Sequence, residues 1–100
     1  MTIEPLLQEI ERIYQAGRAG TEYDFNRDVV PFVERADQLI AEWQMNAQDS
    51  PYLRPNMVES AVDQLKQISV QAFQPKTSLK RFNETIKSVR YIDRLMNGEE

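Results

Sequence analysis

Residues 41–60 of the chain read AEWQMNAQDSPYLRPNMVES, and this stretch decides the fold because it separates two long helical patterns. The segment 49–55 holds two prolines, which stiffen a turn and do not continue a helix. Asn56 is a suitable N-cap, and Glu59 three residues later completes a capping-box signature. The stretch therefore predicts a helix up to about residue 47, a stiff turn, and a new helix from about residue 56.

Helical periodicity also marks both outer parts of the chain. Apolar residues recur at spacings of three and four before the break at 17–21 and again after the break at 74–76. Thr2 and Thr77 are suitable N-caps for these outer helices. We predict helices at about 3–17, 24–47, 56–73 and 78–97.

Pro31 falls inside the second predicted helix and leaves its start open. The helix either begins near Asp24 with a disturbed turn at Pro31, or begins near Asp28 with Pro31 in its first turn. Phe25 and Val29 keep the same phase as the later apolar residues, which favours the start near Asp24.

The same periodicity predicts the core. The inward side chains expected from the four helices are Ile3, Leu6, Leu7, Ile10, Ile13 and Tyr14; Phe25, Val29, Phe32, Val33, Ala36, Ile40, Trp43 and Ala47; Met57, Val58, Ala61, Leu65, Ile68, Ala72 and Phe73; Leu79, Phe82, Ile86, Val89 and Met96. Short connections make neighbouring helices antiparallel. We therefore predict an all-α, four-helix, up-down-up-down bundle that forms one domain over residues 1–100.

Composition excludes several function classes. The chain has 100 residues, 41% of them hydrophobic and 28% charged, and it contains neither cysteine nor histidine. Disulfides, thiol chemistry and the usual zinc, copper and haem ligand sets are therefore impossible, and the commonest general base is missing. We expect no catalytic residues, no metal and no cofactor, and hence a protein that is not an enzyme.

The N-terminal residues Met1–Pro5 lack the basic and apolar regions of a secretory signal. No apolar run approaches the roughly 20 residues that span a bilayer. We expect a cytoplasmic protein with no membrane association.

Charge is distributed unevenly in this acidic chain of net charge −4. Residues 76–97 carry six Lys or Arg against two acidic residues, whereas residues 1–75 carry six against twelve. Helical spacing gathers a candidate basic face on the fourth helix: Lys80, Lys87, Arg90, Tyr91 and Arg94. The face either binds nucleic acid or phosphate, or complements the acidic first and third helices beside it.

Asp93 lies close in direction to Phe82 and Ile86, so it points partly inward near the end of the fourth helix, where the helix dipole disfavours an anion. It is either a ligand or proton-handling carboxylate, or part of a frayed, solvated last turn, or the partner of a basic residue such as Arg54.

One end of the predicted bundle gathers residue types that are common in binding hot spots. The candidate interaction surface consists of Trp43, Met45, Tyr52, Leu53, Arg54, Met57 and Met96. These residues either bind a partner or small ligand, or the larger ones merely cap the core. A neutral polar edge of Gln64, Gln67 and Gln71 on the third helix is a further possible contact face.

Short motifs resemble the YppE-like family of small bacterial helical proteins. They are Lys80-Arg81-Phe82, Ser88-Val89-Arg90-Tyr91, Tyr23-Asp24-Phe25, Pro31 with Val33-Glu34, Trp43 and Pro51-Tyr52, within residues 23–92. The resemblance implies an up-down four-helix bundle of uncharacterised function in a cytosolic protein. This chain departs from the family by being shorter, mainly in the loop between the second and third helices. A secreted helical hairpin of the WXG type is excluded, because Gln44-Met45 follows Trp43 without the required glycine.

These observations favour a non-enzymatic cytosolic protein-interaction or regulatory domain. Its expected partner is a protein, and its expected state is a monomer or weak homodimer. The alternative is a small-ligand, nucleic-acid or phosphate binder that uses the basic face.

Overall fold

The structure is a computed structural model that describes residues 1–98. Its elements are α1 (Glu4–Arg18), a π-helical turn η1 (Phe25–Val29), α2 (Val30–Gln48), α3 (Pro55–Gln71) and α4 (Leu79–Met96). No strand occurs among these residues, so the predicted all-α class is confirmed. The predicted domain also included Glu99 and Glu100, which lie outside the described residues.

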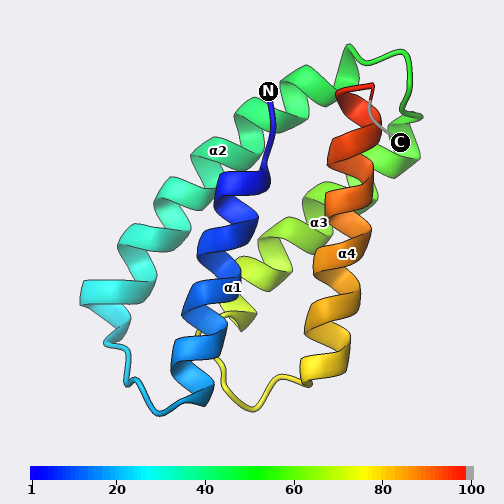
Figure 1. Cartoon of the computed structure of the whole chain (residues 1–100). Coiled ribbons are helices and arrows are strands. Elements are labelled where there is room, and N and C mark those ends of the chain that lie inside the picture. Colours follow the sequence, from blue (N-terminus) through cyan, green and yellow to red (C-terminus); the bar gives the residue numbers. More distant parts are fainter. Residues whose placement is uncertain (99–100) are drawn as a thin grey trace.

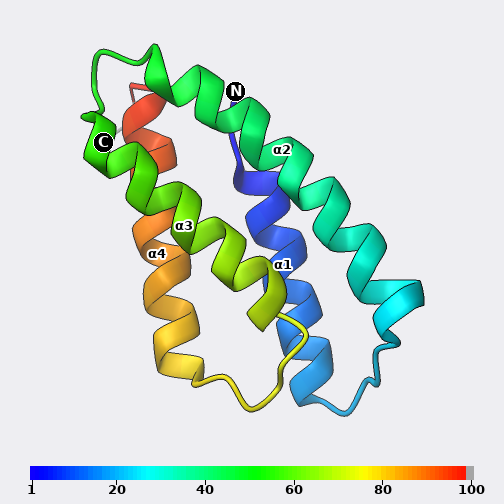
Figure 2. The same cartoon turned by 180° about the vertical axis from the view of Figure 1, so that it is seen from behind.

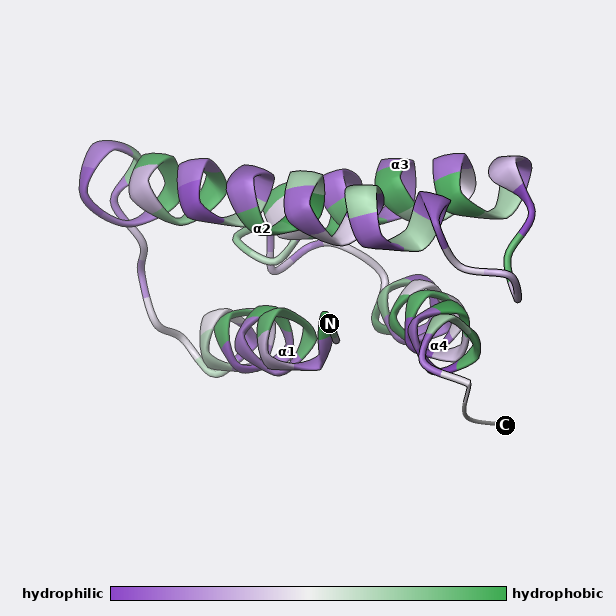
Figure 3. Ribbon diagram, turned by 90° about the horizontal axis from the view of Figure 1, so that it is seen from above, coloured by the Kyte–Doolittle hydropathy of each residue, from purple (hydrophilic) through white to green (hydrophobic). Residues whose placement is uncertain are grey.

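Successive helices run in opposite directions, which gives the predicted up-down-up-down order (Figure 1). α1 and α4 form one layer, and α2 and α3 form the other, as Figures 2 and 3 show. This order brings the start of α1, the end of α2, residues 49–54, the start of α3 and the end of α4 to one end of the bundle (Figure 1). We call it the α2–α3 end.

A single apolar core joins all four helices. Its largest fully buried side chains are aromatic: Trp43, Tyr14 and Phe82. The Tyr14 and Phe82 rings stack with centroids 3.9 Å apart, so they join α1 directly to α4. The predicted core is confirmed for most positions, with Val62 and Ile92 as additional buried residues.

Phe25 and Leu79 are the clear exceptions, because both are exposed. Phe25 begins the π-helical turn, whose wider winding breaks the 3.6-residue phase on which its predicted burial depended. Leu79 is the first residue of α4, three residues before Phe82, where the buried stripe of that helix begins. Phe25 is 65% exposed and is the clearest error in the predicted core.

The start of the second helix combines the two alternatives considered from sequence. Winding begins directly after Asp24, whose carboxylate accepts a hydrogen bond from the Arg27 backbone N–H at 2.7 Å. The α-helix proper begins only at Val30, so Pro31 lies in its first turn. Proline has no backbone N–H to donate, so it would interrupt the hydrogen bonds of an α-helix that began at Asp24. The wider π-helical turn ahead of Pro31 avoids that interruption.

Three predicted N-caps are wrong. Ile3, Arg54 and Ser78 occupy the N-cap positions in place of Thr2, Asn56 and Thr77. Only Ser78 among these three caps its helix with its side chain, by accepting from the Arg81 backbone N–H. α1 and α3 instead have a proline in the first turn, where the missing N–H costs nothing.

Candidate functional site

Asp93 is the most constrained polar residue at the α2–α3 end. Asp93 is only 3% exposed, and its carboxylate accepts hydrogen bonds from three groups distant in the sequence and a longer one, at 3.5 Å, from the side-chain amide of nearby Asn97. Oδ2 accepts from the Thr2 hydroxyl at 2.5 Å. Oδ1 accepts from the Ile3 backbone N–H at 3.0 Å and from the Trp43 indole N–H at 2.9 Å. We call Thr2, Ile3, Trp43 and Asp93 the Asp93 cluster.

The cluster replaces the arrangements that were expected for Asp93. The last turn of α4 is neither frayed nor solvated at this position, and Asp93 forms no salt bridge with Arg54. Hydrogen bonds to a charged acceptor are roughly twice as strong as neutral ones, which offsets the cost of burying the carboxylate. Asp93 also lies beside the N-terminus of α1, whose dipole favours an anion. The geometry assigns Asp93 a structural role that joins α1, α2 and α4.

The Asp93 cluster removes Trp43 from the candidate interaction surface. Trp43 is completely buried, so it belongs to the core and cannot itself touch a partner. Met96 is buried as well, and Met57 is half-buried against the core. Periodicity placed Trp43, Met57 and Met96 on the inward stripes of their helices, and their burial agrees with the alternative in which the larger residues cap the core.

The remaining members of that surface are accessible. Met45 is 69% exposed and Tyr52 is 61% exposed, while Arg54 is exposed and Leu53 is half-buried. Gly98, with a φ of +76°, lies beside the Tyr52 ring. The exposed apolar side chains therefore surround the core residues that were grouped with them from sequence.

A cavity of about 420 Å³ opens between the end of α2 and the start of α3. We call it the α2–α3 cavity, and its lining residues are Gln44, Ala47, Gln48, Leu53, Pro55, Val58 and Glu59. Ala47 and Val58 are buried, whereas Gln48 and Glu59 are exposed. The cavity therefore combines an apolar floor with a polar rim. Of these lining residues, only Leu53 was predicted from the sequence to lie on the interaction surface.

The predicted basic face is divided by its contacts. Arg90 is bound by two carboxylates of α1, with its Nη2 atom 2.8 Å from Glu4 Oε1 and 2.7 Å from Glu11 Oε1. The hydrogen bonds to Glu4, and then those to Glu11, raise the pKa of Arg90 above its ordinary value. Arg90 therefore complements an acidic neighbouring helix, which was one of the two interpretations of this face.

The other members of the basic face point to solvent. Lys80, Lys87, Tyr91 and Arg94 are exposed, and the three cations form no salt bridge within residues 1–98. The available positive surface is therefore smaller than the sequence indicated.

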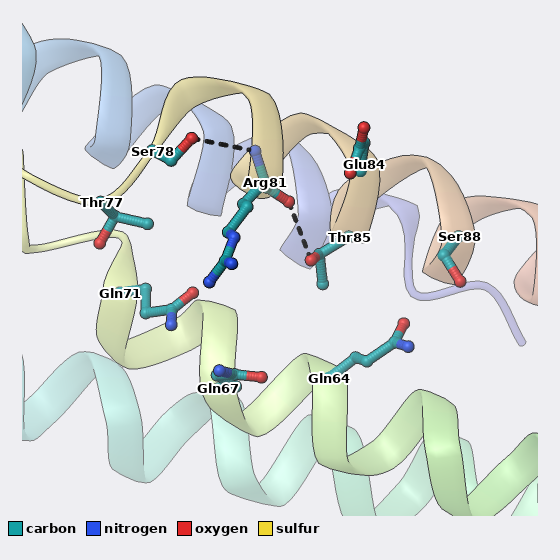
Figure 4. A pocket seen from close by; sticks show the side chains of 9 residues that line it. All are labelled: Gln64, Gln67, Gln71, Thr77, Ser78, Arg81, Glu84, Thr85 and Ser88. Atoms are coloured by element: carbon teal, nitrogen blue, oxygen red, sulfur yellow. Dashed lines mark hydrogen bonds between the residues drawn. The ribbon is translucent and has the colours of Figure 1, made fainter.

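A second cavity, of about 550 Å³, lies between α3 and α4 (Figure 4). We call it the polar cleft, and its lining residues are Gln64, Gln67, Gln71, Thr77, Ser78, Arg81, Glu84, Thr85 and Ser88. The glutamines are the polar edge noted from sequence. Their position opposite the hydroxyl groups of α4 was not predictable from the sequence, because it depends on how the two helices pack.

Residues 1–98 contain no group of three or more His, Cys, Asp or Glu side chains placed to hold a metal ion. Within the same range, the helices are too short or too polar to cross a membrane.

Fold and surface together define a small, antiparallel four-helix bundle with cavities at its helix junctions. The chain belongs to the family described as a bacterial domain of unknown function, DUF1798, which matches residues 3–98. This match, together with the similar fold of the Bacillus subtilis protein YppE, confirms the resemblance to YppE-like proteins.

Similar folds occur among solved structures. A protein of unknown function from Listeria innocua is 25% identical, with a TM-score of 0.77, over 95% of this chain and 85% of that one. The protein YppE from Bacillus subtilis is 23% identical, with a TM-score of 0.80, over 93% of this chain and 84% of that one. No curated protein matches the chain. These comparisons establish family and fold, and none indicates an enzymatic activity.

Proposed function

We propose that this protein is a non-enzymatic interaction domain that binds a partner protein through its α2–α3 end. The proposal includes a cytoplasmic location and a monomer or weak homodimer as the binding unit. The partner would insert an apolar side chain into the α2–α3 cavity and contact Met45 and Tyr52 around it.

The cavity is the observation that carries this proposal. An apolar floor inside a polar rim is the usual arrangement of a protein-binding hot spot, because the rim keeps water away from the buried contact. Leu53 and Val58 supply apolar surface, and Gln48 and Glu59 supply exposed polar groups. Methionine and tyrosine adapt well to a partner surface, and both are accessible at this end.

Rigidity of this end further supports the proposal. Asp93 joins α1, α2 and α4 by hydrogen bonds. Pro51 lies in the turn before α3, and Pro55 is the first residue of α3. A surface that is already ordered loses less conformational entropy when a partner binds. In this account Trp43 supports the site from within the core.

A rim variant tests the proposal. Gln48→Arg combined with Glu59→Arg places two long cations at the mouth of the cavity without altering a buried residue. We expect it to lose partners that the unaltered protein captures from bacterial cytosol, as measured by quantitative mass spectrometry.

The matched control is Gln15→Arg with Glu22→Arg, which makes the same two changes at exposed positions of the opposite end. It should capture the same partners as the unaltered protein. Identical capture by all three proteins would exclude the α2–α3 cavity as the binding site.

A second candidate function is nucleic-acid or phosphate binding by α4. Tyr91, which is 58% exposed, lies on the same helix as the exposed Lys87 and Arg94 and supports this alternative. Binding to nucleic acid must weaken as salt rises, because phosphate contacts release counterions. A salt-sensitive gel shift that disappears in Lys87→Glu, Arg94→Glu would favour it, and the absence of a shift at low salt would exclude it.

A further inference from the structure

The polar cleft differs from the other contacts between helices because its lining contains no apolar residue. Gln64, Gln67 and Gln71 recur at spacings of three and four, so they follow one side of α3. Arg81, Thr85 and Ser88 do the same on α4, and the two rows face each other (Figure 4). The apolar core between these helices lies behind the cleft, where Leu65, Ile68, Phe82 and Ile86 are buried. The residues of the cleft are therefore not needed to pack α3 against α4.

Arg81 supplies the only cationic group of the cleft within the described residues. Its side chain extends from α4 toward Gln71 on α3 (Figure 4). Its guanidinium forms no hydrogen bond or salt bridge with residues 1–98, although the backbone of Arg81 takes part in the α4 cap. Arg90 on the same helix binds two carboxylates, so its charge is neutralised within the fold whereas that of Arg81 is not paired. A guanidinium offers five N–H donors in a fork that fits a carboxylate or phosphate.

The only anionic group of the lining, Glu84, does not neutralise Arg81. Glu84 lines the cleft as well, three residues after Arg81 on α4. No salt bridge joins it to Arg81. The cleft therefore combines a cation and a carboxylate that are not paired with each other, among neutral amides and hydroxyls.

Gln64 adds a second observation at the other side of the cleft. Its Oε1 atom is buried and accepts no hydrogen bond from residues 1–98, while its amide nitrogen donates to the Ser60 hydroxyl at 3.4 Å. The side chain extends along the cleft toward Ser88 (Figure 4). A buried acceptor without a donor is unfavourable, and turning the Gln64 side chain into the cleft would let a hydroxyl group of a ligand satisfy it.

We propose that the polar cleft binds a small polyhydroxylated oxyanion, in which a carboxylate or phosphate binds Arg81 and the hydroxyl groups bind the glutamine row. Amides and hydroxyls both donate and accept, as the hydroxyl groups of a sugar-like ligand require. The cleft volume of about 550 Å³ falls in the range of small-molecule sites. The cleft lies on other helix faces than the α2–α3 cavity, so this proposal does not depend on the proposed function.

Three matched probes test the proposal by NMR on the intact chain: D-gluconate, D-glucose 6-phosphate and D-glucose. We expect one or both anions to shift the side-chain amide signals of Gln64, Gln67 and Gln71, and neutral glucose to bind at least about tenfold more weakly. A response to gluconate alone identifies a carboxylate ligand, and a response to the sugar phosphate alone identifies a phosphate ligand.

Arg81→Gln should weaken binding of the anion by about ten- to a hundredfold. Arg81→Lys should restore part of the affinity, because it keeps the charge and loses the fork. The matched control is Lys80→Gln, which removes the same charge from an adjacent exposed residue outside the lining. The proposal is overturned if neither anion shifts the three glutamine signals at millimolar concentration, or if Arg81→Gln and Lys80→Gln weaken binding equally.

Discussion

Asp93 shows how a single residue determines the structure of the α2–α3 end. A carboxylate at the end of a helix is unfavourable for that helix, because the dipole there is negative. The same carboxylate satisfies the Ile3 backbone N–H and the Trp43 indole N–H, which would otherwise be unpaired. The balance favours burial, since each unpaired buried donor costs about 1–3 kcal/mol.

Substitution of Asp93 should therefore destabilise the whole bundle. We expect Asp93→Ala to lower the free energy of unfolding by about 3 kcal/mol, because two buried donors lose their acceptor. Asp93→Asn keeps one acceptor oxygen and should cost about half as much. Urea unfolding followed by Trp43 fluorescence measures both. Asp37→Ala, at an exposed position of α2, is the control and should change stability by less than about 0.5 kcal/mol.

Arg90 supports a second prediction, about the basic face. Arg90→Met should lower the free energy of unfolding by about 1 kcal/mol, because it removes the half-buried pairs with Glu4 and Glu11. Lys87→Met removes an exposed cation of the same helix and should have almost no effect. Equal effects of the two substitutions in thermal unfolding would contradict the structural role of Arg90.

Among the elements, η1 has an electrostatic feature that makes it sensitive to acid. Hydrogen bonds from the Arg27 side chain, and next from the Asp24 backbone N–H, lower the pKa of Asp28 below its ordinary value. Because the pKa is lowered in the folded chain, the stabilisation is complete above the ordinary value of about 4 and is lost as pH falls through the lowered pKa.

An NMR titration should show this loss as a movement of the Asp24 amide signal below about pH 4. In Arg27→Gln, which lacks the main cause, the same movement should occur at higher pH. A titration unchanged by this substitution would mean that Arg27 does not stabilise the turn.

Helix existence and order were predictable, because each helix carries a long apolar stripe with clear breaks around it. Element ends were less predictable. The side chains of Thr2 and Asn56 are good caps by type, yet α1 and α3 begin one residue away from the expected positions, each with a proline in its first turn. At the start of α1, the buried Asp93 accepts from the Ile3 backbone N–H. Phe25 was misassigned because no periodic pattern signals a π-helical turn ahead of Pro31.

For the whole molecule, the sequence indicated which residues gather at the α2–α3 end, since antiparallel order alone brings them together. Periodicity placed Trp43 and Met96 on inward stripes, but it left open whether they also form part of the contact surface. Trp43 and Met96 fill the core while Met45 and Tyr52 face solvent, and that difference depends on the two layers packing together. The polar cleft was unpredictable for the same reason, because its two rows come from different helices.

The central claim is that the α2–α3 end is the surface that binds a partner. Backbone amide shifts of the isotope-labelled protein, recorded with a partner that the unaltered chain captures, test it most directly. We predict that the shifted signals cluster around the α2–α3 cavity, at Gln48, Leu53 and Glu59, with Met45 and Tyr52 beside them. Shifts that cluster instead at the opposite end, near Gly20 and Pro75, would contradict the claim.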